Sequence, residues 1–368
     1  MSQSSVRLQV YVLTRTLAGI GVALAVVASV IVLVDFAELS RALGGRRDVS
    51  FSQLLELSLL KSPAVILLLA PFVFLFGGLG AFVSLNRRNE LVAMRAAGAS
   101  AWRFTFPAAA AAFVIGLANV ALLNPVAAAL NGTYEDRRAT LNDSSRRGVS
   151  GETWLRQGLD GGQVVIHGRD RDRRNGAVRL TGVSIFVQSV ASNGALQFDR
   201  RIDADQAVLQ PGYWRLTGVR EVRPGLESVR AESLSLPTTL DRRSAMEKFT
   251  PPGAVASWDL PATIRSANQA GYSSLIYRLR LQQLLATPLL LAGMTLLAAA
   301  FSLRLQRLGD LPTLAVTGVA AGFAVFFFNQ FCGALGATET IPIIVAAWVT
   351  PVLAVLSGVT ILCYTEDG

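Results

Sequence analysis

Charged side chains are scarce in this chain of 368 residues. Asp, Glu, Lys and Arg together make up 16% of it, against about 25% in an ordinary soluble domain. Hydrophobic residues make up 52%, and the mean hydropathy is +0.44. This composition disfavours the alternative of a soluble protein with several buried helices, and it predicts a membrane protein.

Residues that bind metals, form disulfides or hold nucleotides are also rare. His167 is the only histidine and has no second histidine or cysteine near it, so we expect no metal site. The two cysteines, Cys332 and Cys363, predict no disulfide framework. The only lysines, Lys61 and Lys248, do not follow a glycine, which excludes a Walker A loop. We therefore expect no ATPase site, and no enzyme, in this chain.

The chain does contain six apolar segments long enough to cross a bilayer, which takes about 20 residues. The second to the sixth carry no Asp, Glu, Lys or Arg. A signal peptide is the alternative for the first segment, but that segment is long for one and lacks a clear cleavage site. We expect six membrane-spanning helices, at residues 17–36, 63–85, 104–130, 281–303, 311–335 and 341–364.

The hydrophilic stretch between the third and fourth apolar segments has a different pattern. Apolar and polar residues alternate in pieces such as AVRLTGVSIFVQS and ESVRAESLSL, with turn residues between them. This predicts short antiparallel strands in a sandwich or roll. The expected fold class is an α-helical membrane protein with six transmembrane helices, three on each side of an inserted all-β domain. The predicted domains are residues 1–130, 131–274 and 275–368.

The predicted strands share one apolar face. This face is either the core of the β domain, which is the usual role of an alternating strand, or a slot that shields an acyl chain. The candidate residues are Val164, Ile166, Ile185, Val187, Val208, Trp214 and Leu216.

Lysine and arginine in the short loops predict the orientation. With a cytoplasmic N-terminus, eight of these charges lie inside and four outside. Both termini are then cytoplasmic, and the β domain lies on the outer side. The inner charges are Arg7, Arg15, Arg87, Arg88, Arg95, Arg103, Arg304 and Arg307, and the outer ones are Arg41, Arg46, Arg47 and Lys61.

The segment RRNELVAMRAAGAS, residues 87–100, joins the second and third apolar segments on the predicted inner side. Its helix formers, followed by Gly98 as a C-terminal cap, predict a short amphipathic helix. Leu91 and Met94 give it an apolar edge that fits a groove on a partner protein. The alternative is a helix that rests on anionic lipid headgroups. Glu90 favours the protein partner, because a carboxylate gains nothing from anionic lipid and pairs with a basic residue.

The chain resembles the LptF/LptG family of lipopolysaccharide-export ABC transporter permeases over essentially its whole length. The similar motifs are YVLTRTL before the first apolar segment, VDFAEL at its end, RRNELVAMRAAGAS and, in the β domain, ADQAVLQPGYWRLTGV. VDFAEL is more similar to the LptG members than to the LptF members. One difference is that family members carry lysine in the outer part of the first span, whereas here the nearest basic residue is Arg41.

The resemblance implies a permease subunit in the inner membrane of a Gram-negative bacterium, which takes lipopolysaccharide from the outer leaflet and passes it on through a β-jellyroll domain. ATP and Mg²⁺ would be bound by a cytoplasmic ATPase dimer (LptB-like). Other implied partners are an LptF-like second permease and periplasmic β-jellyroll bridge proteins (LptC/LptA-like), with no nucleic acid. The implied docking residues for the ATPase are Glu90, Leu91, Met94, Arg95 and Gly98.

Lipid phosphates require cations at the outer level of the spans. Arg41, Lys61, Arg278 and Arg280 are the candidates, because guanidinium groups suit phosphate. For Arg278 and Arg280 the alternative is snorkelling at the start of the fourth span. Two other functions stay open: a membrane-anchored scaffold or signalling protein whose outer domain binds protein, and an ABC permease that transduces force without moving lipid.

Overall fold

The computed structural model describes residues 2–43, 50–98, 100–145, 153–159, 162–168, 170–172, 179–190, 196–238, 252–269, 273–304 and 311–366. Arg46, Arg47 and Arg307, which entered the charge count, lie outside the described residues. The chain divides into a helical unit and a β unit. The helical unit is Met1–Ala139, Pro252–Pro261 and Leu275–Gly368, and the β unit is Thr140–Pro251 and Ala262–Ser274.

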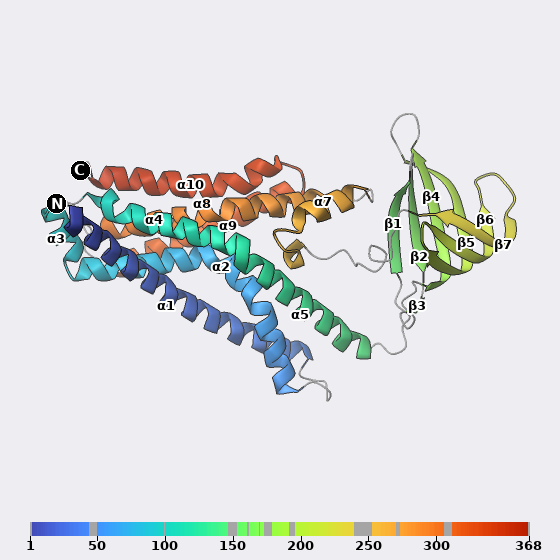
Figure 1. Ribbon diagram of the computed structural model, residues 1–368, viewed down its shortest axis with the longest axis horizontal. Coiled ribbons are helices and arrows are strands. Elements are labelled where there is room, and N and C mark those ends of the chain that lie inside the picture. The colour runs from blue at the N-terminus through green and yellow to red at the C-terminus, as the bar shows by residue number, and fades with distance from the viewer. Residues whose placement is uncertain are drawn as a thin grey trace. The chain divides into compact units, whose positions relative to one another are not determined.

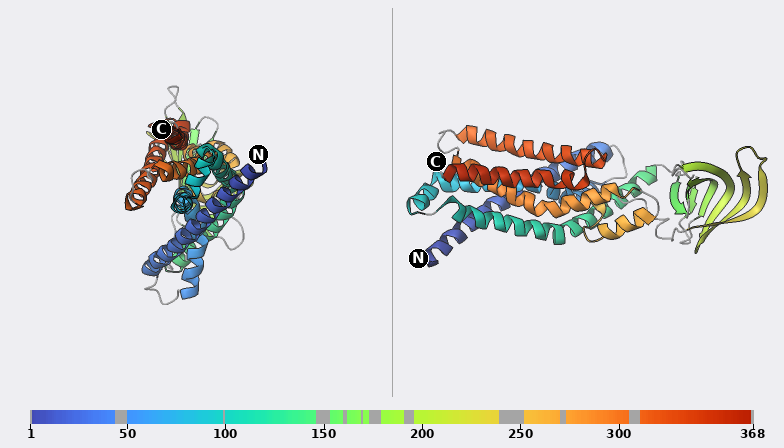
Figure 2. Two further views of the ribbon diagram at one scale, coloured as in Figure 1. Left: turned by 90° about the vertical axis from the view of Figure 1, so that its left-hand side faces the viewer. Right: turned by 90° about the horizontal axis from the view of Figure 1, so that it is seen from above.

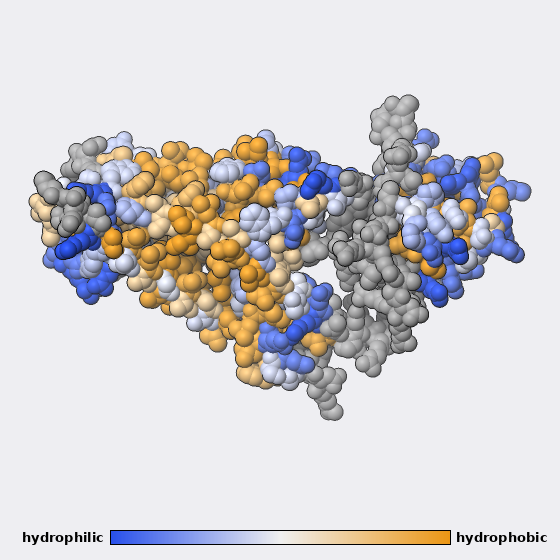
Figure 3. Space-filling model, viewed as in Figure 1, coloured by the Kyte–Doolittle hydropathy of each residue, from blue (hydrophilic) through white to orange (hydrophobic). Residues whose placement is uncertain are grey.

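Six helices in the described ranges are long and apolar enough to cross a membrane, which confirms the prediction of a multi-pass helical protein. The surface over these spans is hydrophobic, with hydrophilic residues gathered toward its ends (Figure 3). The spans are Arg7–Ala42, Phe51–Arg87, Ala101–Arg138, Leu275–Leu303, Val316–Ala337 and Ile343–Thr365.

The helices follow one another along the chain as labelled in Figure 1. They are α1 (Ser2–Leu43), α2 (Phe51–Arg87), α3 (Glu90–Ala96), α4 (Ala101–Ala118), the π-helix η1 (Asn119–Leu123), α5 (Asn124–Ser145), the 3-10 helix η2 (Pro252–Ala254), α7 (Leu260–Gln269), α8 (Leu275–Arg304), α9 (Leu311–Ala337) and α10 (Ile343–Glu366).

Helix α8 forms the centre of the helical unit and contacts α10, α2, α4 and α9. Its residues Leu291 and Met294 are fully buried in a cluster with Leu75 of α2 and Ala112 of α4. Small residues let the helices approach closely: a Cβ added at Gly116 of α4 would lie 2.5 Å from the Cα of Pro288. Such close packing of backbones is how helices associate in lipid, where hydrophobic burial alone gives no driving force.

The third span contains one turn of π-helix, η1, between α4 and α5. A π turn shifts the backbone register and leaves carbonyl groups that need other donors. The Ser257 hydroxyl donates to the Val120 carbonyl at 2.8 Å, and the Trp258 indole donates to the Ala121 carbonyl at 3.0 Å. The Ser257 backbone N–H also donates to the Asn124 side chain. The segment after the β domain is thereby bound to the third span.

The β unit contains one antiparallel sheet, strongly bent in the right-hand view of Figure 2. The strand order is β1-β2-β4-β5-β6-β7, and the short strand β3 is off this path and pairs with β4. This confirms the inserted all-β domain, as a roll rather than a two-sheet sandwich. The strands are β1 (Thr153–Leu159), β2 (Gly162–Gly168), β3 (Asp170–Asp172), β4 (Arg179–Val190), β5 (Leu196–Gln210), β6 (Tyr213–Val222) and β7 (Val229–Pro237).

The predicted apolar face is the core of this roll, with one exception. Val164, Ile166, Ile185, Trp214 and Leu216 are fully buried in one cluster, and Val187 packs against it. Val208 does not belong to the cluster, whose members on β5 are Ile202, Ala204, Ala207 and the partly buried Leu209.

The Val208 prediction was wrong because the alternation of β5 changes phase between Ala204 and Ala207. At this point Gly182 of β4 and Gly218 of β6 both have positive φ, 56° and 65°. Both lie beside Asp205 in the registers of the flanking strands, and a Cβ at Gly218 would collide with the Asp205 carboxylate. Glycine accepts this conformation without steric cost, so the bend runs across three strands.

Hydrogen bonds join the two end strands of the sheet. The Gln157 side chain on β1 is fully buried and donates from Nε2 to the Pro237 carbonyl of β7 at 3.2 Å. The Thr238 hydroxyl donates to the side-chain carbonyl of Gln157. Because β1 and β7 lie at opposite ends of the strand order, these bonds close the roll.

Candidate functional site

The inner segment forms α3, a seven-residue helix between α2 and α4. The chain reverses at Asn89, whose φ of 56° is left-handed; asparagine tolerates this conformation better than most residues. Gly98 after the helix has a φ of 83°, as a C-terminal glycine cap requires. Helix α3 therefore starts and stops where the residues permit sharp turns.

The apolar edge of α3 packs against its own chain. Leu91 is 1% exposed and lies in a cluster with Phe82 and Leu85 of α2 and Phe104 of α4, and Met94 is partly buried against it. Burying a leucine side chain stabilises a fold by about 1.5–3 kcal/mol. Leu91 thus anchors α3 to the ends of the second and third spans.

Glu90 connects α3 to the first span. The Tyr11 hydroxyl donates to the Glu90 carboxylate at 2.9 Å, and Nε of Arg15 donates to the Tyr11 oxygen at 3.3 Å. The Arg15 guanidinium carbon also lies 5.3 Å from the centroid of the Tyr11 ring, a cation–π contact. This chain of contacts orients one Glu90 oxygen and links α3 to α1.

Arg95 connects α3 to the last span. Its Nη2 donates to the carbonyl of Thr365, near the end of α10, at 3.2 Å. The ends of a helix leave such carbonyls without an intrahelical partner, and a cation near them is favourable. Helix α3 is therefore held by α1, α2, α4 and α10, which are four different parts of the helical unit.

The outward side of α3 carries small and apolar residues. Val92 is 46% exposed, and Ala93, Ala96, Ala97 and Gly98 are exposed. Both chain ends lie at the same end of the helical unit as α3 (Figure 1). Glu90 is half-buried and faces Tyr11 of α1.

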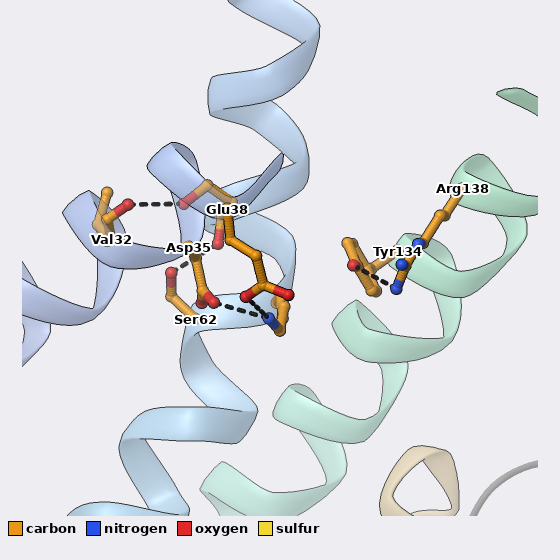
Figure 4. A network of polar contacts seen from close by, with 8 residues as sticks. Val32, Asp35, Glu38, Ser62, Tyr134 and Arg138 are labelled. Carbon is orange, nitrogen blue, oxygen red and sulfur yellow. Dashed lines mark hydrogen bonds and ion pairs between the residues drawn. The ribbon is translucent and has the colours of Figure 1, made fainter. Parts of the chain in front are cut away.

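The opposite end of α1 and α2 carries a cluster of Lys61, Asp35 and Glu38 (Figure 4). Nζ of Lys61 lies 2.7 Å from Oδ1 of Asp35 and 3.5 Å from Oε2 of Glu38. The Asp35 side chain is 8% exposed and that of Glu38 is 67% exposed. The Ser58 hydroxyl donates to the Val32 carbonyl in the same region. One cation between two carboxylates leaves the cluster with a net negative charge.

Arg41 lies beside the Lys61 cluster, whereas the two predicted arginines of α8 are not joined to it in the described part of the chain. Arg41 is exposed and lines a hollow on α1 together with Glu38. Arg278 is exposed and Arg280 is half-buried, both in the first turns of α8. Among the described residues, no hydrogen bond or ion pair joins either α8 arginine to Lys61. The structure thus leaves Arg41 and Arg278 open to the surroundings.

The β unit carries its own charged group on β6, outside the spans. Burial acts to raise the pKa of Glu221, but the hydrogen bond from Arg223 and the charge of Arg200 outweigh it, so its pKa lies below the usual value. Nε of Arg223 lies 2.9 Å and Nη1 of Arg200 lies 3.2 Å from the Glu221 carboxylate. These contacts stabilise the C-terminal end of β6 at neutral pH.

Sequence reasoning missed the residues that tie α3 to the rest of the unit. Tyr11 lies in the motif YVLTRTL, which is similar to the family but predicts no contact with Glu90, and Thr365 lies in no motif. Tyr11 is 79 residues from Glu90, and Thr365 is 270 residues from Arg95. Such pairs become visible only when it is known which spans pack against one another.

Comparison with known proteins identifies the family. A search of curated proteins finds no match. The model of the family described as lipopolysaccharide export system permease LptF/LptG matches residues 10–364, which cover all six spans and the β unit. This match favours a lipopolysaccharide export permease over the alternative of a scaffold or signalling protein. It does not distinguish LptF from LptG. The chain therefore belongs to the LptF/LptG family of lipopolysaccharide export permeases.

Proposed function

We propose that this permease is driven by a separate cytoplasmic ATPase dimer (LptB-like), which binds ATP and Mg²⁺ and docks on α3. The observation that carries the proposal is the attachment of α3 to α1 through Glu90, to α2 and α4 through Leu91, and to α10 through Arg95. A force applied to α3 reaches four helices at once. A helix that merely rested on lipid headgroups would need no such attachment.

In this proposal the protein lies in the inner membrane with both termini and α3 in the cytoplasm. The excess of arginine at the α3 end of the spans supports this orientation. The β unit then lies in the periplasm and passes lipopolysaccharide to β-rich bridge proteins (LptC/LptA-like). A second, LptF-like permease completes the lipid cavity, because α1 and α9 are the spans with the smallest buried share, 11% and 17% of their most apolar windows, and so have faces left for another chain.

For the lipid phosphates we propose Arg41 and Arg278 as the first contacts, because both are exposed. Lys61 is held by Asp35 and Glu38, so its charge becomes available to a phosphate only when that ion pair opens. Arg280 is half-buried and becomes a contact only for a headgroup that enters between the helices.

The docking proposal is tested by Glu90→Arg in a tagged chain co-expressed with the candidate ATPase. Reversing the charge removes a charge-assisted contact, so the amount of co-purified ATPase should fall by roughly tenfold or more. Glu227→Arg, an exposed reversal in the β unit, serves as the control and should leave capture unchanged. Equal capture by Glu90→Arg and the control would remove Glu90 from the docking site.

Tyr11→Phe separates docking from transmission. This variant keeps the Glu90 charge but removes its hydrogen bond to α1. The ATPase should still co-purify, while stimulation of ATP hydrolysis by lipopolysaccharide should weaken. Unchanged stimulation would show that α1 receives the motion by another route.

A further inference from the structure

A groove follows the seam between α1 and α2 on the α3 side of the helical unit. Its volume is about 370 Å³, and it runs along α2 from Phe76 to Arg88. The walls in the membrane are apolar or small, whereas the end near α3 is polar. The apolar part is lined by Ala18, Gly19, Val22, Ala23, Gly77 and Ala81, and the polar end by Tyr11, Arg15, Ser84, Arg88 and Glu90.

Helix packing does not account for the open part of this groove. Gly77 and Gly19 are required by the crossing of α1 and α2, because a Cβ at either position would meet the other backbone. Gly80 has no atom within 4 Å of an added Cβ and is exposed. Glycine inside a helix is destabilising relative to alanine. At Gly80 this loss leaves space that no side chain in the described part of the helical unit fills.

The dimensions of the groove fit a single hydrocarbon chain. The thirteen residues from Phe76 to Arg88 are separated by twelve helical steps and span about 18 Å, close to the roughly 15 Å of one bilayer leaflet. The volume averages about 20 Å² in cross-section over that length.

The charges at the polar end fit a phosphate. Arg15 is oriented by Tyr11 through its Nε and the ring face, which leaves both terminal nitrogens available. Arg88 is exposed, and among the described residues its side chain has no hydrogen-bond or ion-pair partner. Glu90 is the opposing charge, and one of its oxygens is occupied by Tyr11. Two guanidinium groups against one carboxylate favour an anion, and arginine binds phosphate in a forked geometry.

We propose that this groove binds an anionic glycerophospholipid of the leaflet on the α3 side, with one acyl chain over Gly80 and the phosphate between Arg15 and Arg88. The site lies at the end of the spans opposite to Arg41 and the Lys61 cluster, so it is separate from the path proposed for exported lipid. It does not depend on the partner ATPase. Because Arg15 also holds Tyr11, a bound phosphate would contact the same residues that orient Glu90.

The test measures lipid retained by the full-length protein after purification from nanodiscs of dioleoylphosphatidylglycerol and dioleoylphosphatidylcholine. Gly80→Leu fills the groove and should lower retained phosphatidylglycerol by roughly tenfold, because the acyl chain loses apolar contact along the groove. Gly21→Leu is the matched control, because Gly21 is also a helix glycine with nothing within 4 Å but does not line the groove. Equal retention by the two variants would overturn the proposal.

Two further results bear on the same site. Arg15→Gln combined with Arg88→Gln should abolish the preference for phosphatidylglycerol over phosphatidylcholine, and a preserved preference would contradict the phosphate contacts. In the unaltered protein, a phosphatidylglycerol with a diazirine in its tail should label residues 76–88. Labelling spread evenly over all spans would overturn the site even if Gly80→Leu fails to fold. Loss of a co-purified protein from Gly80→Leu, with lipid unchanged, would make the groove a protein interface and end the proposal.

Discussion

Helices α8 and α1 are both apolar spans, yet their own chain covers them to very different extents. In the most apolar window of α8, 78% of residues are buried within the chain, against 11% in α1. Helix α8 packs on several sides, against α10, α2, α4 and α9. Helix α1 packs mainly along α2, where Val12 and Ile20 are buried, and polar contacts near its two ends, Glu90–Tyr11 and Asp35–Lys61, hold it further. A helix so little covered by its own chain must be covered by lipid or by a second protein.

The largest effect is expected where a residue is forced into the packing of α8. Gly116→Leu would drive a side chain into the backbone of Pro288, and overpacking costs typically 1–3 kcal/mol, more when backbone must move. Gly21→Leu on α1 meets open space and should change stability by less than about 0.5 kcal/mol. Thermal unfolding in detergent compares the two. Similar losses of stability would erase the distinction between α8 and α1.

A medium effect is expected at the outer attachment of α1. Asp35→Asn removes the closer, buried partner of Lys61. The free energy of unfolding should fall by about 1–3 kcal/mol, which is less than for a buried ion pair that loses its sole partner, because Glu38 still pairs with Lys61. Glu38→Gln removes an exposed partner and should cost less than about 0.5 kcal/mol. The matched pair is measured by the same unfolding assay. A larger loss for Glu38→Gln would mean that α1 is not held at Asp35.

A smaller effect is expected at the π turn of the third span. Ser257→Ala and Trp258→Phe each remove one donor to the η1 carbonyls and should each cost about 1 kcal/mol. Ser29→Ala removes only a bond to the carbonyl four residues earlier in exposed α1 and serves as the control. Hydrogen exchange of residues 119–127 should rise in the first two variants and stay unchanged in the control. Unaltered exchange would show that η1 is stable without the donors.

The smallest effect is expected in the β unit, which lies outside both helices of the comparison, α8 and α1. Because the folded pKa of Glu221 is lowered, its contribution to stability is present above its ordinary pKa of 4.5 and is lost as the pH falls through the folded pKa. Hydrogen exchange of β6 should therefore rise on acidification below about pH 4.5. Arg223→Gln should flatten this dependence. An equally steep dependence in that variant would assign the effect to another acid.

The sequence was sufficient to predict the spans and the inserted β domain, because both depend on the pattern of apolar residues within one element. The spans show as uncharged runs, and most of the roll's core shows as alternation. Val208 was misplaced because two left-handed glycines in the neighbouring strands change the phase of burial, and a strand's own pattern does not show its neighbours' bends.

The candidate site was only partly predictable. The pattern from Glu90 to Gly98 predicts an amphipathic helix, but it does not indicate whether Leu91 packs against a partner protein or against its own chain. In the structure Leu91 packs against its own chain. The Lys61 pair depends on the crossing of α1 and α2, which no local pattern encodes. The predicted phosphate contacts therefore differ in their surroundings: Lys61 is in an ion pair, Arg41 and Arg278 are exposed, and Arg280 is half-buried.

We propose that the energy for export enters through α3 from a separate ATPase. The most direct test is transfer of lipopolysaccharide out of proteoliposomes that contain the purified permease, with or without the ATPase partner and ATP. Transfer is expected only when the permease pair, the ATPase and ATP are all present, and it should be lost in Glu90→Arg. If this chain alone transferred lipopolysaccharide, with no companion protein and no nucleotide, α3 would not be the point where energy enters.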